Sequence, residues 1–307
     1  MTAESRLERL VRSGTFCVTA EVVPPRSADG GVVRAQARQL VGYADAVNVT
    51  DNPRAAAHMS PVAGVALVAA AGLEPTMQLT CRDRNRLGLT SDLLGGWALG
   101  ARNLFCLTGD PVGVGDHPDA STVNDMTVEE LVGLAAGLRE DGRSLSGAEV
   151  DDPPRFFIGV ADVPLAPSYD PGRLEGKLDA GAGFVMTQIV YDVEALGAWV
   201  EIARSRGIVE RAALIAGVAP LASAKQARFL DEKVPGVSVP PELIHALEDA
   251  GDEAPAVGVA QCVEVVRRLR RLNGVVGVHI MGMGHEEGVR AVVEDAGLLP
   301  RPVDVST

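Results

Sequence analysis

Glu21 stands out in this sequence because its position favours acid or base chemistry. It lies near the end of the apolar stretch 17–23, and Pro24 and Pro25 follow that stretch. Proline has no amide hydrogen to give to a sheet and keeps the preceding residue extended, so the predicted strand ends within one or two residues of Glu21. A carboxyl group at the C-terminal end of a strand is where parallel α/β folds hold catalytic groups. An ion pair with Arg26 is the alternative interpretation.

Polar side chains also follow the ends of other predicted strands. These residues are Thr50, Asp51, Thr80, Asp110 and Gln188. In a parallel barrel the C-terminal ends of all strands meet at one mouth, so we expect these residues to become neighbours of Glu21. For each threonine, the alternative is a structural role in the uppermost layer of the barrel. The carboxylates and the amide, which come from different strands, favour a functional site.

The elements that position these residues form a regular repeat of strand and helix. Strands are predicted at 17–23, 44–50, 75–80, 103–108, 156–160, 184–188, 212–217 and 275–280. Eight strands alternating with helices predict a (β/α)8 TIM barrel, an α/β fold, as a single domain over 1–307. A short amphipathic helix over 4–13 is expected to plug the base of the barrel, and 141–155 is expected to be a surface loop. A doubly wound open sheet would need a break in the repeat or an N-terminal G-x-G-x-x-G, and neither is present.

Composition and charge exclude several classes of function. The net charge of −13 argues against a nucleic-acid partner and against binding to an anionic membrane surface. No apolar run reaches the 18 or so residues that a membrane helix needs. The four cysteines have no C-x-x-C spacing, which is typical of reduced thiols in a cytoplasmic protein. The five histidines have no metal-binding spacing, so no metal is expected. A monomer or small homo-oligomer is expected.

Several motifs, in order along the chain, resemble the methylenetetrahydrofolate reductase family. They are Ala-Glu-Val-Val-Pro-Pro-Arg at 20–26, Val49-Thr50, Leu79-Thr80-Cys81, Gly109-Asp110, Lys-Leu-Asp-Ala-Gly-Ala at 177–182 and Thr-Gln-Ile-Val-Tyr-Asp at 187–192. The resemblance covers about residues 15–295. It implies a barrel that reduces 5,10-methylenetetrahydrofolate to 5-methyltetrahydrofolate with a nicotinamide nucleotide as the hydride donor.

The resemblance also implies roles for individual residues. Glu21 matches the proton donor, Asp110 a catalytic, pterin-facing aspartate, and Gln188 a glutamine shared by folate and nicotinamide. Folate binding is further expected from Thr50 and Thr80. Cofactor binding is expected from Gln188, Thr108, Lys177, Gly282 and Gly284.

A proton donor that works near neutral pH needs a raised pKa. For Glu21 we expect this from burial and from the charge of Asp110 across the barrel mouth. The glycines of the segment 282–288 follow the last strand, where barrels often bind phosphate, although Glu286 and Glu287 would repel that group.

The sequence departs from the family where flavin is bound. Family members with flavin have Arg-Gly-Asp after the fourth strand, a histidine before the Thr-Cys pair of the third, and Tyr-Pro-x-x-His-Pro after the fifth. Here Thr108 replaces the arginine, residues 78–81 read Gln-Leu-Thr-Cys without the histidine, and residues 159–167 lack the third motif. A further departure concerns folate: Ala224 replaces an aromatic residue that would contact its benzoyl ring.

Loss of the arginine removes a bidentate phosphate donor. We therefore predict direct hydride transfer from NADH, with NADPH as a possible donor and FAD as a doubtful cofactor. The alternatives are a conventional FAD-dependent reductase and a non-catalytic folate-binding accessory protein. Retention of both Glu21 and Gln188 favours an enzyme, because a protein that only binds folate needs no acid to open the ring.

Overall fold

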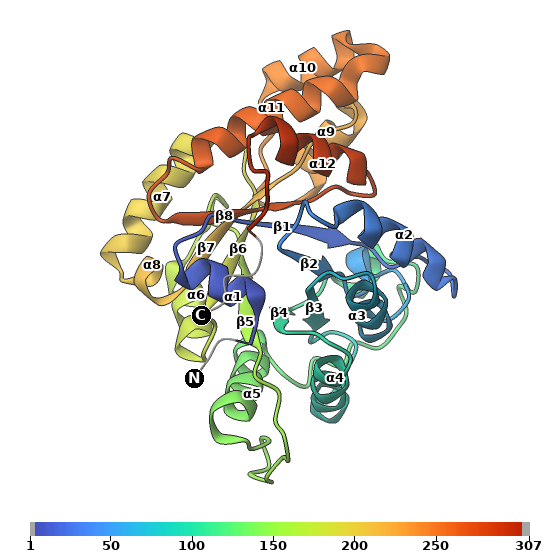
Figure 1. Ribbon diagram of the computed structural model, residues 1–307, viewed down its shortest axis with the longest axis vertical. Coiled ribbons are helices and arrows are strands. Elements are labelled where there is room, and N and C mark those ends of the chain that lie inside the picture. The colour runs from blue at the N-terminus through green and yellow to red at the C-terminus, as the bar shows by residue number, and fades with distance from the viewer. Residues whose placement is uncertain (1–3, 303–307) are drawn as a thin grey trace.

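Eight parallel strands close into one barrel in the order β1 to β8, as the computed structural model of residues 4–302 shows (Figure 1). The strands are β1 (Cys17–Val22), β2 (Ala46–Val49), β3 (Pro75–Thr80), β4 (Asn103–Leu107), β5 (Phe157–Asp162), β6 (Phe184–Ile189), β7 (Ala213–Val218) and β8 (Val275–Ile280). The predicted (β/α)8 barrel is therefore confirmed. The predicted domain limits, 1 and 307, lie outside the described residues.

Helices surround the barrel, and those from α2 to α11 lie between successive strands in the sequence (Figure 1). They are α1 (Arg6–Arg12), α2 (Gly30–Leu40), α3 (Pro61–Ala70), α4 (Arg86–Ala98), α5 (Val128–Asp141), α6 (Pro171–Asp179), α7 (Val193–Ser205), α8 (Ile208–Arg211), α9 (Ala224–Lys233), α10 (Pro241–Asp249), α11 (Ala254–Leu269) and α12 (Glu286–Asp295). Three short 3-10 turns are η1 (Pro53–Ala55), η2 (Val112–Val114) and η3 (Gly251–Glu253).

Turns that contain glycine separate several of the helices. α10 begins at Pro241, after a turn at Pro235 and Gly236 in which Gly236 has a φ of +77°. α7 ends at Ser205, and the short α8 follows a left-handed Gly207. The predicted surface loop between α5 and β5 is present and contains an antiparallel bridge from Arg143 to Glu149.

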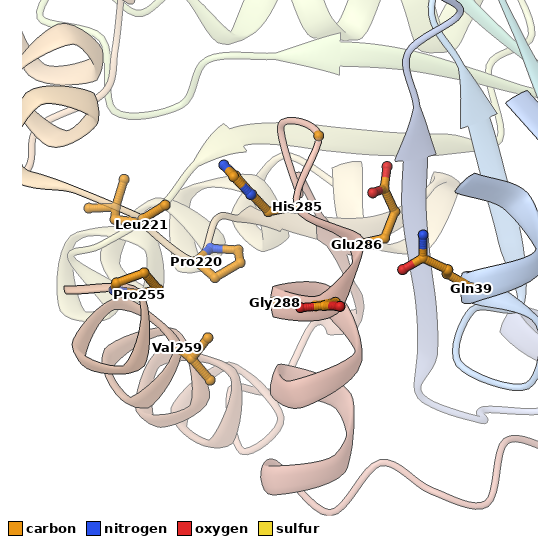
Figure 2. Close-up of a pocket in the computed structure, with 11 residues that line it drawn as sticks. Gln39, Pro220, Leu221, Pro255, Val259, His285, Glu286 and Gly288 are labelled. Atoms are coloured by element: carbon orange, nitrogen blue, oxygen red, sulfur yellow. The ribbon is translucent and has the colours of Figure 1, made fainter. Parts of the chain in front are cut away.

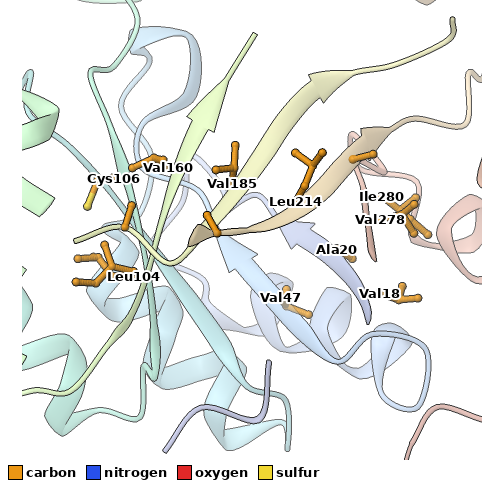
Figure 3. Close-up of a cluster of buried hydrophobic side chains, with 14 of the residues drawn as sticks. Val18, Ala20, Val47, Leu104, Cys106, Val160, Val185, Leu214, Val278 and Ile280 are labelled. Carbon is orange, nitrogen blue, oxygen red and sulfur yellow. The ribbon is translucent and has the colours of Figure 1, made fainter. Parts of the chain in front are cut away.

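Side chains of the strands alternate between the barrel interior and the surrounding helices. The outward-facing side chains form the largest buried cluster, and Figure 3 shows members of it on most of the strands. The interior is filled by a second cluster: Leu7, Cys17, Ala46, Phe105, Phe157, Phe184, Met186, Ala213 and Ile215. Leu7 belongs to α1, so the N-terminal helix packs against this interior cluster.

Bulky rings inside the barrel require small residues opposite them. A Cβ atom at Gly159 would lie 2.1 Å from Cζ of Phe184, so a glycine on β5 makes room for the ring of β6. The rings of the interior cluster therefore pack closely against small residues of the neighbouring strands.

The remaining sequence expectations concern cysteines and membranes. All four cysteines, Cys17, Cys81, Cys106 and Cys262, are buried and free, as the spacing indicated. Among the described residues no helix has the length and hydropathy to cross a membrane. No cluster of three potential metal ligands occurs within residues 4–302.

Candidate active site

Glu21 lies in a cavity of about 140 Å³ at the C-terminal end of the barrel. The cavity is lined by Glu21, Asn48, Gln78, Phe105, Ala161, Asp162, Val163, Met186, Thr187, Gln188, His279 and Met281. The strand that carries Glu21 ends at Val22, directly before the Val-Pro-Pro step, as predicted. The structure therefore brings Glu21 and Gln188, which are 167 positions apart in sequence, to one cavity.

Burial raises the pKa of Glu21 to about 7, and a hydrogen bond from the backbone of Met283 acts in the opposite direction. The carboxyl group is therefore partly protonated at neutral pH, as a proton donor requires. Burial was one of the two causes we predicted. The other, the charge of Asp110, is wrong, because it does not contribute to the shift.

His279 is a site residue that the sequence reasoning missed. It lies on β8 opposite Thr19 of β1 in the sheet register, and its Nδ1 is 2.9 Å from Oγ1 of Thr19. Burial lowers the pKa of His279 to about 4, so the imidazole is neutral at pH 7. Its position near the end of a predicted strand is the signal in the sequence that identifies it, whereas the spacing of the histidines bears only on metal binding.

Gln188 lines the cavity from β6, on the same strand face as Phe184 and Met186 of the interior cluster. The register between β6 and β7 shifts between Met186 and Ile189, and the hydroxyl of Thr187 stabilises this shift by accepting from the amide of Gly217 at 2.9 Å. The side-chain oxygen of Gln188 accepts from the amide of Ile189 at 3.0 Å. The amide NH₂ of Gln188 is therefore the part of the side chain suited to bind a ligand.

Thr50 and Thr80 differ in whether their hydroxyl groups are free to hydrogen-bond to a ligand. The hydroxyl of Thr80 donates to Oδ2 of Asp51 at 3.0 Å, and the Asp51 carboxylate also binds both terminal nitrogens of Arg84, at 2.7 and 3.0 Å. Thr80 is therefore committed to a buried protein network. The hydroxyl of Thr50 is buried and lacks a hydrogen-bond partner within the described chain, as does Oδ1 of Asn48. Such groups are normally satisfied by water or by a ligand.

Asp110 is exposed and does not line the cavity of Glu21. Its carboxylate accepts from the backbone amide of Arg54 at 2.7 Å, and its carbonyl accepts from the guanidinium of Arg82 at 3.1 Å. Thr108 is exposed on the same loop. In this conformation, Asp110 fixes the loop after β2 and makes no contact with the reaction cavity.

Lys177 is also not brought to the cavity. Its Nζ donates to the carbonyl oxygen of Ala161 at 2.8 Å, from α6 on the outer side of β5. Lys177 therefore braces the end of the strand that forms one wall of the cavity.

Gly282 and Gly284 lie in the loop between β8 and α12. Gly284 lines a separate hollow of about 430 Å³ between the start of α12, α11 and the segment after β7 (Figure 2). Glu286 and Glu287 line this hollow, and its lining includes no lysine or arginine. A pyrophosphate would meet an unfavourable potential here. Gly282 has a packing role, because a Cβ atom there would lie 2.7 Å from Val289.

Arginine is the side chain best suited to bind the phosphates of a flavin dinucleotide. Three arginines follow β3, but each is paired with a carboxylate: Arg82 with Asp83, Arg84 with Asp51 and Asp92, and Arg86 with Asp125. Phosphate binding would have to compete with these ion pairs. The cavity of Glu21 offers a nicotinamide the NH₂ of Gln188 as a hydrogen-bond donor.

Comparison with known proteins gives a consistent result. The family described as methylenetetrahydrofolate reductase matches residues 6–297. A Caenorhabditis elegans relative named "Probable methylenetetrahydrofolate reductase (NADPH)" is 26% identical over 313 residues, which cover 95% of this chain and 44% of the relative. The Escherichia coli 5,10-methylenetetrahydrofolate reductase is 29% identical over 240 residues, covering 75% of this chain and 72% of that protein.

The eukaryotic relatives are much longer than the matched region, and two solved structures share the fold of this chain at low sequence identity. The chain spans less than half the length of the eukaryotic relatives from C. elegans and Schizosaccharomyces pombe. A Clostridium thermocellum protein, described as binding two copies of 5-methyl-5,6,7,8-tetrahydrofolic acid, superposes with a TM-score of 0.64 at 12% identity over 96% of this chain and 100% of that one. DmoA from Hyphomicrobium sulfonivorans gives 0.59 at 10% identity, covering 91% and 86%. At these identities the structural similarity concerns the fold alone.

Proposed function

Because this chain belongs to the methylenetetrahydrofolate reductase family, we propose that it reduces 5,10-methylenetetrahydrofolate to 5-methyltetrahydrofolate by direct hydride transfer from NADH, without bound flavin. The observation that carries the proposal is the place of Glu21 in one cavity with Gln188 and His279, where burial raises the pKa of its carboxyl group to about 7. NADPH is the second candidate donor.

In this reaction, protonation of the substrate must precede hydride transfer. In the proposed reaction, Glu21 protonates a nitrogen of the five-membered ring, the bond from that nitrogen to the bridging carbon breaks, and an iminium cation forms on the substrate. The nicotinamide ring supplies the hydride when bound, and the bridging carbon becomes the methyl group. Gln188 orients the reactants through its NH₂, and Glu21 is then reprotonated from solvent.

The neutral imidazole of His279 does not lower the pKa of Glu21. A protonated imidazole near Glu21 would favour the carboxylate and lower the pKa of Glu21, whereas a neutral one does not. The contact between His279 and Thr19 fixes the orientation of the ring in the cavity wall. Thr50, whose hydroxyl has no partner within the described residues, is the further group that we propose contacts folate.

Two observations support a reaction without flavin. The arginine of the family's Arg-Gly-Asp motif is Thr108, and the three arginines after β3 are paired with aspartates. A conventional FAD-dependent reductase and a non-catalytic folate-binding protein are the competing possibilities. We also propose a cytoplasmic location, because the four cysteines are free and buried, and a monomer or small homo-oligomer as the working state.

The deciding experiment combines a spectrum with anaerobic turnover. We expect the purified protein to be colourless and to oxidise NADH only when 5,10-methylenetetrahydrofolate is present, at a rate that added FAD does not change. A protein with stoichiometric bound flavin would refute direct transfer. A protein that binds folate but oxidises neither NADH nor NADPH would indicate the non-catalytic alternative.

A further inference from the structure

An arginine and a phenylalanine from distant segments meet over one side of the barrel mouth. The guanidinium of Arg54, in η1 after β2, lies 5.1 Å from the ring centroid of Phe229 in α9. In the barrel, β1 and β8 lie between β2 and β7, and α9 follows β7. The contact therefore spans the ends of the two strands that carry Glu21 and His279.

The backbone around Arg54 is held in an unfavourable conformation. Asn52, Arg54 and Ala55 have φ values of 46°, 57° and 54°, a region that residues other than glycine rarely adopt. Hydrogen bonds compensate for this cost: the amide of Arg54 donates to Asp110 at 2.7 Å, and Arg82 donates to the carbonyl of Asn52 at 3.3 Å. The loop is therefore pre-organised to hold the Arg54 side chain over the mouth.

The charge of Arg54 is available to a ligand. The arginines at 26, 82, 84 and 86 around the same mouth are all paired with aspartates, whereas no ion pair involves Arg54 within residues 4–302. Lys225 lies one helical turn before Phe229 and is likewise exposed without an ion pair in the described chain. Phe229 keeps 39% of its surface exposed. Two uncommitted cations thus flank an exposed aromatic ring.

We propose that Arg54, Lys225 and Phe229 form a clamp for the tail of the folate substrate, an inference that rests on the proposed function. The tail consists of a benzoyl ring followed by one or more glutamates. Its ring fits the apolar face of Phe229, its first glutamate fits the planar guanidinium of Arg54, and further glutamates fit Lys225. The clamp contacts only the tail, so it determines binding and leaves the chemistry at the bridging carbon to Glu21.

The structural alternative is that Arg54 packs on Phe229 only to hold the loop closed. The two roles differ in how they depend on the ligand. Loss of a purely structural contact disturbs the site for every folate, whereas loss of the clamp weakens only ligands that carry a tail. A substrate pair that differs only in the glutamate separates them.

The test uses the whole protein and measures both binding and turnover. Affinities for 5-methyltetrahydrofolate, its triglutamate and the primary amide of 5-methyltetrahydropteroate (the pteroate below), which lacks glutamate and carries no carboxylate, are measured by calorimetric titration for the wild type, Arg54→Ala, Phe229→Leu and Lys225→Ala. Charge-assisted hydrogen bonds of this kind correspond to about 10-fold to 100-fold in affinity. We expect Arg54→Ala to lose that factor for the folates and less than twofold for the pteroate.

The clamp also predicts how the other two variants change ligand affinity and how Arg54→Ala changes KM and kcat. Lys225→Ala should weaken the triglutamate alone, and Phe229→Leu should weaken all ligands with a benzoyl ring. With methylenetetrahydrofolate, Arg54→Ala should raise KM while kcat is retained. Arg228→Ala is the matched control, because this neighbour of Phe229 is paired with Glu248 away from the clamp.

Two results would overturn the clamp: an equal loss of pteroate and folate binding in Arg54→Ala, or unchanged folate affinity in that variant. Because the titrations need no turnover, they stay informative if NADH oxidation is absent. A protein that binds the folates with this pattern but reduces nothing would keep the clamp and refute the proposed reaction. Wild-type protein that binds none of the three ligands would refute both.

Discussion

Replacement of Glu21 by glutamine should remove turnover and, at the same time, stabilise the protein at alkaline pH. Glutamine keeps the shape of the side chain and its hydrogen bonding but cannot protonate the leaving nitrogen. A general acid contributes about 10²-fold to 10⁴-fold to a rate, so we expect a loss of that size with folate and NADH affinities retained.

The expected stability change follows from the pKa of Glu21, which rises from 4.5 to about 7 on folding. The folded state therefore binds a proton that the unfolded state has released between these values. Stability falls as pH rises from 4.5 to 7 and stays lower above 7, by roughly 3 kcal/mol for a shift of this size. Glutamine does not titrate, so Glu21→Gln should avoid this loss.

The assay is urea unfolding of wild type and Glu21→Gln at pH 5 and pH 8. Relative to wild type, the variant should gain about 2 to 3 kcal/mol in free energy of unfolding between the two pH values. The wild-type reduction rate should fall about tenfold per pH unit above 7, because the protonated fraction of Glu21 falls by that factor. Equal stability changes in both proteins, or substantial turnover by Glu21→Gln, would refute the reasoning.

Three further substitutions test the remaining site. Gln188→Ala should lower kcat about 10²-fold, because an oriented donor is lost at the transition state, while the far-ultraviolet circular dichroism stays that of the wild type. Asp51→Asn should reduce the free energy of unfolding by about 3 kcal/mol, because Asp51 is buried in an ion pair with Arg84 and Arg84 would keep only Asp92 as a partner. An unchanged urea midpoint would argue against the importance of this ion-pair network. Asp110→Ala should raise KM for folates more than it lowers kcat, because its carboxylate holds the amide of Arg54, and a pure kcat effect would instead favour direct contact with the pterin.

The sequence was informative wherever strand geometry alone decides a position. The proline pair ends β1 next to Glu21, and alternation along β1 directs this residue into the barrel. Gln188 followed from the same argument, because alternation along β6 places it on the face of Phe184 and Met186. His279 obeys the alternation too, and pairing of β1 with β8 would have placed it beside Thr19.

Loop residues were less predictable, for a physical reason. Asp110 and Thr108 follow β4, and the direction of the chain after a strand depends on contacts with other loops. Asp110 is drawn toward the amide of Arg54, a contact that exists only because Asn52, Arg54 and Ala55 adopt positive φ values. No local sequence pattern predicts three such residues without glycine. Lys177 faces the outside of β5 because helix packing directs it there.

The arrangement of charge around the mouth links the acid to the proposed absence of flavin. A free guanidinium near Glu21 would stabilise its carboxylate and lower its pKa, so an acid with a pKa of about 7 requires neutral surroundings. Arg82, Arg84 and Arg86 satisfy this requirement because aspartates neutralise each of them. The same pairing supports the proposal that no flavin is bound, because a flavin phosphate would have to compete with these aspartates. A cation that remains free must then act away from the acid, as Arg54 does over the ring of Phe229, where an anionic tail can be bound without disturbing the proton on Glu21.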